Sequence, residues 1–260
     1  MFFLNKAGRS ARILILTTWL ACALGAVCAT EAAASADARQ DRKEVRIGDV
    51  IAGSPLWAEW SRRYVRPSGR VVDTAARGAS HSEGQGYGML LAVAAGDRPA
   101  FDRIWGWTQA NLAVRLDNLF AWRWDPVSRA VSDRNNATDG DILIAWALAE
   151  AADLWNAPAY AEAGAFVAAA VARHLVLDAV GVGPVLLPAS FGFAQSDQPD
   201  GPVVNLAYWV FPAFSRLAQL APGQDWEAVR RTGLAILDAI QSQAPARVGN
   251  WTALADRKAA

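Results

Sequence analysis

Residues 137–155 constrain this chain more than any other stretch; they read Ala-Thr-Asp-Gly-Asp-Ile-Leu-Ile-Ala-Trp-Ala-Leu-Ala-Glu-Ala-Ala-Asp-Leu-Trp. Isoleucine, alanine and tryptophan recur there at helical spacing, which predicts one helix with an apolar face. Thr138 is the expected N-cap, and Asp139 and Asp141 fall in the first turn, where carboxylates meet free amides and the positive end of the helix dipole. The sequence therefore predicts a buried helix that begins with two carboxylates.

A second stretch, residues 82–91, has the same layout of hydroxyl, acid, glycine and apolar helix: Ser-Glu-Gly-Gln-Gly-Tyr-Gly-Met-Leu-Leu. Between the two stretches we expect one helix over residues 99–112, with Pro99 in its first turn. In an array of antiparallel hairpins, alternate helices point the same way, so Glu83 and Asp139 should lie at the same end. Two carboxylates that face one cleft are what glycoside hydrolysis requires.

Both stretches resemble motifs of a known enzyme family. Residues 137–155 are similar to the signature helix of glycoside hydrolase family 8, and Ser82-Glu83-Gly84-Gln85, followed by Tyr87-Gly88-Met89, resembles that family's general-acid segment. The resemblance runs from about residue 57 to about residue 251. It implies an all-α fold, the (α/α)6 barrel, with a catalytic domain over residues 54–260.

The resemblance also implies an activity, which is endo-acting hydrolysis of β-1,4-glucan with inversion. It makes Glu83 the proton donor and Asp139 the second catalytic carboxylate, in contact with the distorted sugar. A helix N-terminus lowers a carboxyl pKa, whereas a general acid needs a raised one, so burial or a neighbouring carboxylate must prevail. Asp139 is the expected neighbour. Within the family the chain is most similar to enzymes that accompany bacterial cellulose synthase, so that machinery is an expected partner besides the glucan.

The family's general base is expected in a Ser/Gly-Tyr-Asp-Ala-x-Arg segment, and these 260 residues contain no such segment. About seven helices are also too few for six hairpins, so we expect a barrel that is incomplete at the C-terminal side. A non-catalytic glycan-binding remnant of the same fold is therefore the second functional hypothesis. A hydrolysis assay separates the two, because only an enzyme produces new reducing ends.

Further residues are candidates for substrate binding. Trp122 and Trp124 flank an arginine ahead of a proline turn, and flat indoles stack on sugar faces; the alternative is that both rings pack in the core. Tyr87 belongs to the general-acid segment, and Asp141 either supports the site or holds the start of its helix. Asn205 and Tyr208 resemble a substrate-side position of the family, although a helix cap and a core tyrosine explain them equally well.

Three glycines interrupt the predicted Glu83 helix, namely Gly84, Gly86 and Gly88. Each costs roughly 1 kcal/mol against alanine in a helix, so close approach to the backbone is expected to compensate. A sugar ring and a neighbouring helix are equally good candidates for what approaches.

Helical patterns also cover residues 55–65, 158–174, 205–220 and 225–241, while residues 181–193 read as an extended loop and convincing strands are few. Pairs of such helices at intervals of roughly 30 to 50 residues are typical of helical repeat arrays.

The first residues have the layout of an export signal. Three basic residues precede an apolar run of about fifteen residues and a small-residue zone, which predicts a signal peptide over residues 1–29 and a flexible lead-in over residues 30–53. The run is short for a membrane span, so we expect no stable span after cleavage and a periplasmic or secreted protein. Both cysteines lie in this segment, so the mature chain should contain none.

Composition narrows the remaining functional classes. Of the chain, 53% is apolar and 19% charged, as in a soluble globular protein, and the formal net charge of zero makes nucleic acid an unexpected partner. The two histidines, His81 and His174, lie far apart in the sequence, so we expect no metal site, no cofactor and no histidine-based triad.

Overall fold

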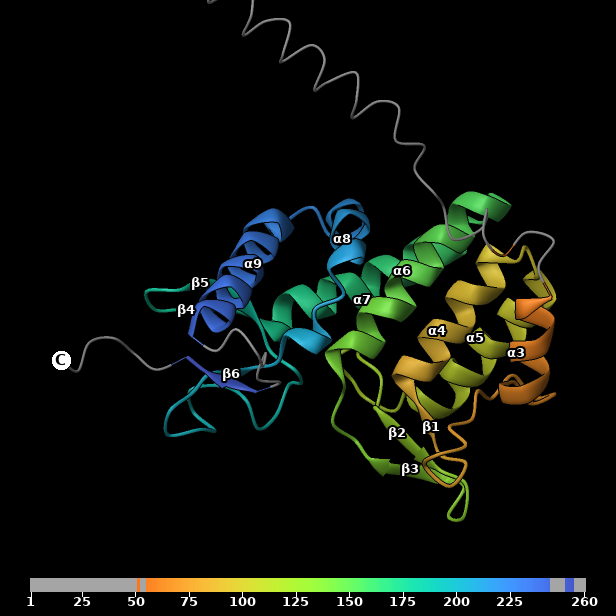
Figure 1. The fold of residues 1–260 in the computed structure, drawn as a ribbon. Helices are drawn as coiled ribbons and strands as arrows, with labels where there is room; N and C mark the ends of the chain where they lie inside the picture. Colours follow the sequence, from red (N-terminus) through yellow and green to blue (C-terminus); the bar gives the residue numbers. More distant parts are fainter. Residues whose placement is uncertain (1–50, 52–54, 244–250, 255–260) are drawn as a thin grey trace, which may run out of the picture. The chain divides into compact units, whose positions relative to one another are not determined.

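The computed structural model describes residue 51 and residues 55–243 and 251–254, all of which belong to one unit that spans residues 47–260. The predicted signal peptide and nearly all of the lead-in lie outside the described residues. In the described part the chain forms seven α-helices joined by loops and short strands (Figure 1).

Five helices make up the first part of this unit, and the sequence predicts each of them to within a few residues. Asp97 accepts a hydrogen bond from the amide of Ala100 and so caps one helix, and Asn156, in the left-handed conformation, ends another. The five are α3 (Leu56–Tyr64), α4 (Ser82–Ala94), α5 (Arg98–Leu112), α6 (Thr138–Trp155) and α7 (Pro158–Leu175).

Helix α6 lies at the centre of the core and packs against α4 and α7, while α5 packs on the other side of α4 (Figure 1). Residues 142–145 are all buried, so α6 is covered on every side at its first full turn. Gly86 of α4 faces Leu143 of α6 so closely that a Cβ on Gly86 would lie 2.5 Å from the Leu143 Cβ. Of the two candidates for what approaches these glycines, the neighbouring helix is therefore the one found at Gly86.

The predicted helix over residues 205–220 is the clearest error. The structure has two 3-10 turns there, η1 (Leu206–Tyr208) and η2 (Phe211–Ala213), followed by the short helix α8 (Phe214–Leu220). Pro212 has no amide hydrogen and cannot continue a helix through its own position, which is why the apolar pattern breaks into pieces. Helix α9 (Trp226–Gln243) then follows nearly as predicted.

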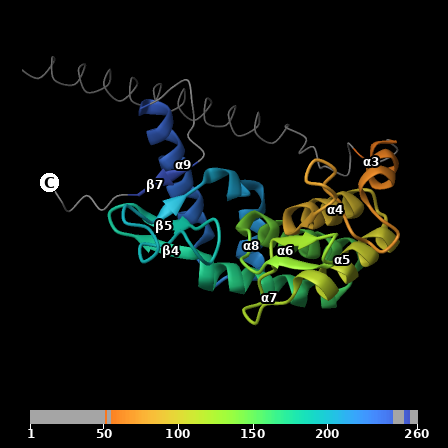
Figure 2. The ribbon, with the colours of Figure 1, turned by 90° about the horizontal axis from the view of Figure 1, so that it is seen from below.

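Short strands are the feature that the helical patterns did not predict. β1 (Ser80–His81), β2 (Arg123–Asp125) and β3 (Ala130–Asp133) form an antiparallel sheet beneath the lower end of α4 in Figure 1. The expected extended loop over residues 181–193 contributes β5 (Gly183–Leu186), which pairs with β4 (Val176–Ala179) and lies beside α9 (Figure 2). β6 (Val203–Val204) pairs with β7 (Thr252–Ala253).

None of the helices that the structure describes is both long and apolar enough to cross a membrane.

Candidate active site

The starts of α4 and α6 touch each other, and this contact builds the site. A Cβ on Gly140 would lie 2.8 Å from the Glu83 amide nitrogen and would also collide with the side chain of Ser82. Because the two helices also meet one turn further on, at Gly86, they run in the same direction. The structure thus brings Glu83 and Asp139, each the second residue of its helix, to one end of the helix pair, as the alternation of helices predicts.

Thr138 does not act as the N-cap that the sequence suggests. It is the first residue of α6, after Ala137 in extended conformation, and its hydroxyl donates a hydrogen bond of 2.6 Å to the Leu187 carbonyl. Its amide donates to the carbonyl of Pro188 at 3.0 Å. The threonine therefore fastens the start of α6 to the segment after β5.

Both carboxyl groups at this contact have raised pKa values. Burial, and then the charge of Glu83, raise the pKa of Asp139 to about 7, although the Gly140 amide donates to its carboxyl group at 2.8 Å. For Glu83, partial desolvation is the larger cause of the raised pKa and the charge of Asp73 the smaller one. Desolvation and like charges therefore shift both groups towards the protonated form.

Asp73 is a neighbour of Glu83 that the sequence did not point to. Its carboxylate accepts the amides of Ala75 and Ala76 at 2.8 and 3.0 Å and lies 3.6 Å from the His81 imidazole. The turn that these bonds form places a fixed negative charge on the Glu83 side of the site. The sequence contains the Asx-turn pattern, but no local signal indicates what the turn faces.

Two tyrosines lie close enough to Glu83 and Asp139 for the carboxyl charges to shift their pKa values. Tyr87 lies one helical turn after Glu83 and is 48% exposed, and partial desolvation, followed by the charges of Glu83 and Asp139, raises its pKa. Tyr208, in η1, has a pKa raised by burial, Asp139 and Glu83 in that order. Both phenols therefore remain protonated near the carboxyl groups, where they can donate hydrogen bonds to a polar ligand.

Trp122 lies beside the start of α4. Its ring is stacked on His81, with ring centroids 5.4 Å apart and planes within 10°. Its ring nitrogen donates to Asp133, and its carbonyl accepts the Ser82 amide at 3.0 Å. The half-buried indole is thereby held in one orientation near Glu83.

The structure corrects the expectation for Trp124. Its side chain is only 9% exposed, and its ring makes an edge contact with Trp107 at 5.5 Å while the Arg70 guanidinium covers it at 4.9 Å. Alternation along β2 turns Trp124 towards the core, whereas Trp122 lies just before the strand. Trp124 therefore supports the fold, and its ring has no free face for a sugar.

Asp141 and Asn205 both accept hydrogen bonds that hold the fold. Asp141 is completely buried, which raises its pKa, while the Phe120 amide and the Asn136 side chain donate to its two oxygens and oppose that rise by favouring the ionised form. Asn205 is buried, and its side-chain oxygen accepts the Ala207 amide at 3.0 Å, so it caps η1.

An aromatic stack extends the site beyond Tyr208. Trp251, 53% exposed, lies parallel to Phe193 with ring centroids 5.5 Å apart and 6.1 Å from the Tyr208 ring. The pairing of β7 with β6 brings Trp251 there from a distant part of the sequence. Sequence analysis missed this stack because a non-local pairing of two-residue strands has no local pattern.

No cluster of three or more acidic, histidine or cysteine side chains that could hold a metal ion occurs within residues 55–243 and 251–254 or at residue 51.

Comparison with known proteins decides the family. The profile described as "Glycosyl hydrolases family 8" matches residues 47–260. The chain belongs to this family. Its members have the (α/α)6 barrel fold, so the predicted all-α class is confirmed, with the short strands as additions in the loops.

Individual relatives agree with this assignment. An endoglucanase from Cellulomonas uda is 39% identical over 199 residues, which is 76% of this chain and 54% of the relative. A probable endoglucanase from Novacetimonas hansenii is 39% identical over 198 residues, covering 75% and 54%. An endo-β-1,4-glucanase from an Achatina fulica gut metagenomic library has a solved structure with a TM-score of 0.72 at 36% identity, covering 78% of this chain and 64% of that one. The chain thus spans about half the length of the curated relatives it matches.

Proposed function

We propose that this glycoside hydrolase cleaves internal β-1,4 linkages of glucan. The observation that carries the proposal is the pair of carboxyl groups with raised pKa values on two touching helix starts, Glu83 and Asp139. Relatives named endoglucanase support the same substrate class.

Glu83 is the proton donor in this proposal. It gives its proton to the glycosidic oxygen as the bond from that oxygen to the anomeric carbon breaks, and water attacks the anomeric carbon from the opposite face with inversion. Partial desolvation and the Asp73 charge raise the pKa of Glu83 and so favour its protonated form, which is the state that a general acid needs. The water's proton goes to a general base, to which no residue described above is assigned.

Asp139 binds the distorted sugar at the reacting centre. Its pKa is raised to about 7, so near neutral pH both forms are present: the protonated form can donate a hydrogen bond to the sugar, and the ionised form can accept one. Tyr87 and Tyr208 add phenol donors beside it, and Trp122 offers a fixed indole for stacking.

The cellular setting is part of the proposal. A signal peptide over residues 1–29, a lead-in over residues 30–53 and a catalytic domain over residues 54–260 would place the protein in the periplasm or outside the cell. The proposal includes a role beside the bacterial cellulose synthase machinery, because the sequence resembles the family 8 enzymes that accompany it.

The test is hydrolysis and binding measured side by side. The chain should release new reducing ends from carboxymethylcellulose, and Glu83→Gln should stop this while it still binds cello-oligosaccharides. Glu59→Gln is the matched control, because Glu59 is also an exposed acid in the first turn of a helix, on α3. Binding without new reducing ends in the parent would favour the non-catalytic glycan-binding hypothesis.

A further inference from the structure

A buried chain of hydrogen bonds ends on Asp141. The Ser190 amide donates to the side-chain oxygen of Asn136 at 2.7 Å, and the Asn136 amide group donates to one oxygen of Asp141 at 2.8 Å. The Phe120 amide donates to the other oxygen at 2.8 Å. Asp141 is 0% and Asn136 2% exposed. Every donor points towards Asp141, so this carboxyl group is the final acceptor of the chain.

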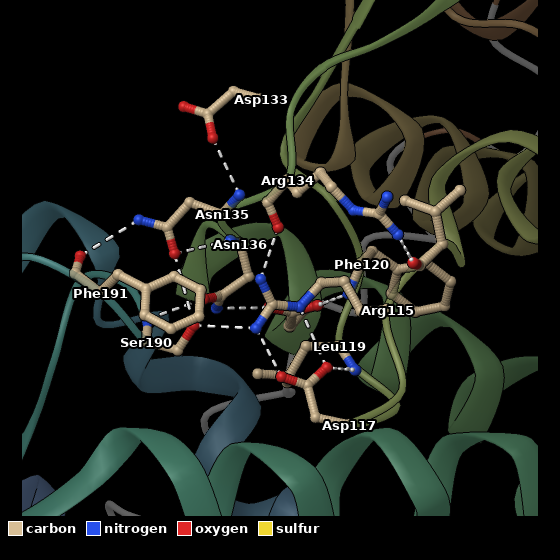
Figure 3. Close-up of polar contacts among 12 residues, drawn as sticks. Arg115, Asp117, Leu119, Phe120, Asp133, Arg134, Asn135, Asn136, Ser190 and Phe191 are labelled. Carbon is tan, nitrogen blue, oxygen red and sulfur yellow. Dashed lines mark hydrogen bonds and ion pairs between the residues drawn. The ribbon is translucent and has the colours of Figure 1, made fainter.

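The outer end of the chain is fixed by an arginine (Figure 3). Arg115 donates to the Ser190 hydroxyl at 2.8 Å and to the Arg134 carbonyl at 2.5 Å. Two nitrogens of its guanidinium also meet Asp117, at 3.0 and 2.5 Å. Ser190 is therefore held from both its amide and its hydroxyl.

The inner end of the chain joins the two helix starts. The segment 120–122 bonds to the start of α6 through the Phe120 amide and Asp141, and to the start of α4 through the Trp122 carbonyl, which accepts the Ser82 amide at 3.0 Å. Asp139 and Asp141 are two residues apart, about 200° around the helix, so one faces the site and the other faces segment 120–122.

We propose that Asp141 is a positioning residue that, through segment 120–122, sets the separation of the Glu83 and Asp139 carboxyl groups. The inference rests on the proposed function, since it gives those two groups a reason to be held apart at a fixed distance. Positioning errors of about 1 Å can lower turnover on the order of 100-fold.

Hydrogen-bond directions make the role of Asp141 testable. The ionised form of Asp141 accepts with both oxygens, as the two donors that face it require. In Asp141→Asn one oxygen is replaced by an NH2 group, which must face a donor: either the Phe120 amide or the Asn136 amide group. Turning Asn136 over only moves the conflict to the Ser190 amide, which can do nothing but donate. Every arrangement of the variant therefore leaves two donors face to face.

The exchanged pair restores the chain. In the double variant Asn136→Asp with Asp141→Asn, the carboxylate at 136 accepts both the Ser190 amide and the new amide at 141. The oxygen of that new amide accepts the Phe120 amide. All three hydrogen bonds are kept, and the carboxylate lies at position 136 and no longer at position 141.

The experiment compares the full chain with Asp141→Asn, the exchanged pair and Asp125→Asn. The last is the matched control: Asp125 accepts two backbone amides at the exposed end of the β2–β3 hairpin. One readout is turnover of carboxymethylcellulose across pH. The other is the pH titration of the Asp139 carboxyl ¹³C signal, which is identified by its absence in Asp139→Asn. This signal senses the charges of the surrounding Glu83, Tyr87, Tyr208 and Asp141.

Asp141→Asn should lower turnover roughly 10- to 100-fold and move the Asp139 midpoint by more than about half a pH unit, and the exchanged pair should restore both. Asp125→Asn should change neither. An exchanged pair as impaired as the single variant, or a single variant like the parent, would overturn the inference. If Asp141→Asn does not fold, Asn136→Ser, which is too short to bridge, gives the same comparison. A parent without hydrolysis would refute the proposed function alone, because the Asp139 titration still decides the positioning.

Discussion

Replacing Asp139 by asparagine should stabilise the protein at pH 8. The pKa of Asp139 rises from 3.8 to about 7 on folding, and each pKa unit is worth about 1.4 kcal/mol. About three units therefore correspond to roughly 4 kcal/mol, the most that the folded state loses when Asp139 ionises. Asparagine keeps the size of the side chain and can still accept the Gly140 amide, but it cannot ionise.

The sign of the effect follows from the direction of the shift. Folding favours the protonated form of Asp139, so its contribution to stability is complete below about pH 4 and is lost as the pH rises through about 7. The gain in the free energy of unfolding in Asp139→Asn should therefore be near zero at pH 4 and reach up to about 4 kcal/mol at pH 8.

Urea unfolding of the parent and the variant at pH 4, 6 and 8 measures this difference. Asp125→Asn is a control of opposite sign, because the backbone amide of Ser128 lowers the pKa of Asp125. A variant that is no more stable than the parent at pH 8, or a gain that is the same at every pH, would refute the reasoning.

Three further expectations can be checked with single variants or isolated protein. Gly86→Ala should cost about 1–3 kcal/mol in unfolding experiments because the new methyl group meets α6, whereas Gly106→Ala, in a helix with open space around it, should gain up to about 1 kcal/mol. Trp124→Ala should lower the free energy of unfolding by about 3–5 kcal/mol, because Trp124 packs in the core. Trp122→Ala should weaken cello-oligosaccharide binding roughly three- to tenfold in calorimetry, because the Trp122 ring is proposed to stack on sugar. The reverse pattern would contradict the core role of Trp124 and the binding role of Trp122. Mass spectrometry of exported protein should find residues 1–29 removed and no titratable thiol, and an intact N-terminus would contradict the signal peptide.

The helices could be predicted because their signals are local. Apolar periodicity, Pro99 and Pro158 in first turns and the acidic starts give α4 to α7 almost to the residue. The same locality explains the error at residues 205–220, where periodicity outweighed Pro212 in the prediction. The strands were missed because two to four residues carry too little pattern, and their partners lie elsewhere in the chain.

The site shows the same division between local and non-local information. Helix order was enough to bring Glu83 and Asp139 together, because alternate helices run parallel. It could not tell that Asp141, two residues on, turns inwards, or which of two neighbouring tryptophans enters the core. Those outcomes depend on what lies across the fold, such as the Phe120 amide for Asp141 and Trp107 for Trp124.

The most direct test of Glu83 as the proton donor measures the rates of the parent and of Glu83→Gln on two substrates. Cleavage of glucan needs a proton on the leaving oxygen, whereas a 2,4-dinitrophenyl cello-oligosaccharide has a leaving group that departs without one. The variant should lose about 10²–10⁴ in rate on glucan and little on the activated substrate. Equal losses on both substrates, or none on glucan, would show that Glu83 is not the proton donor.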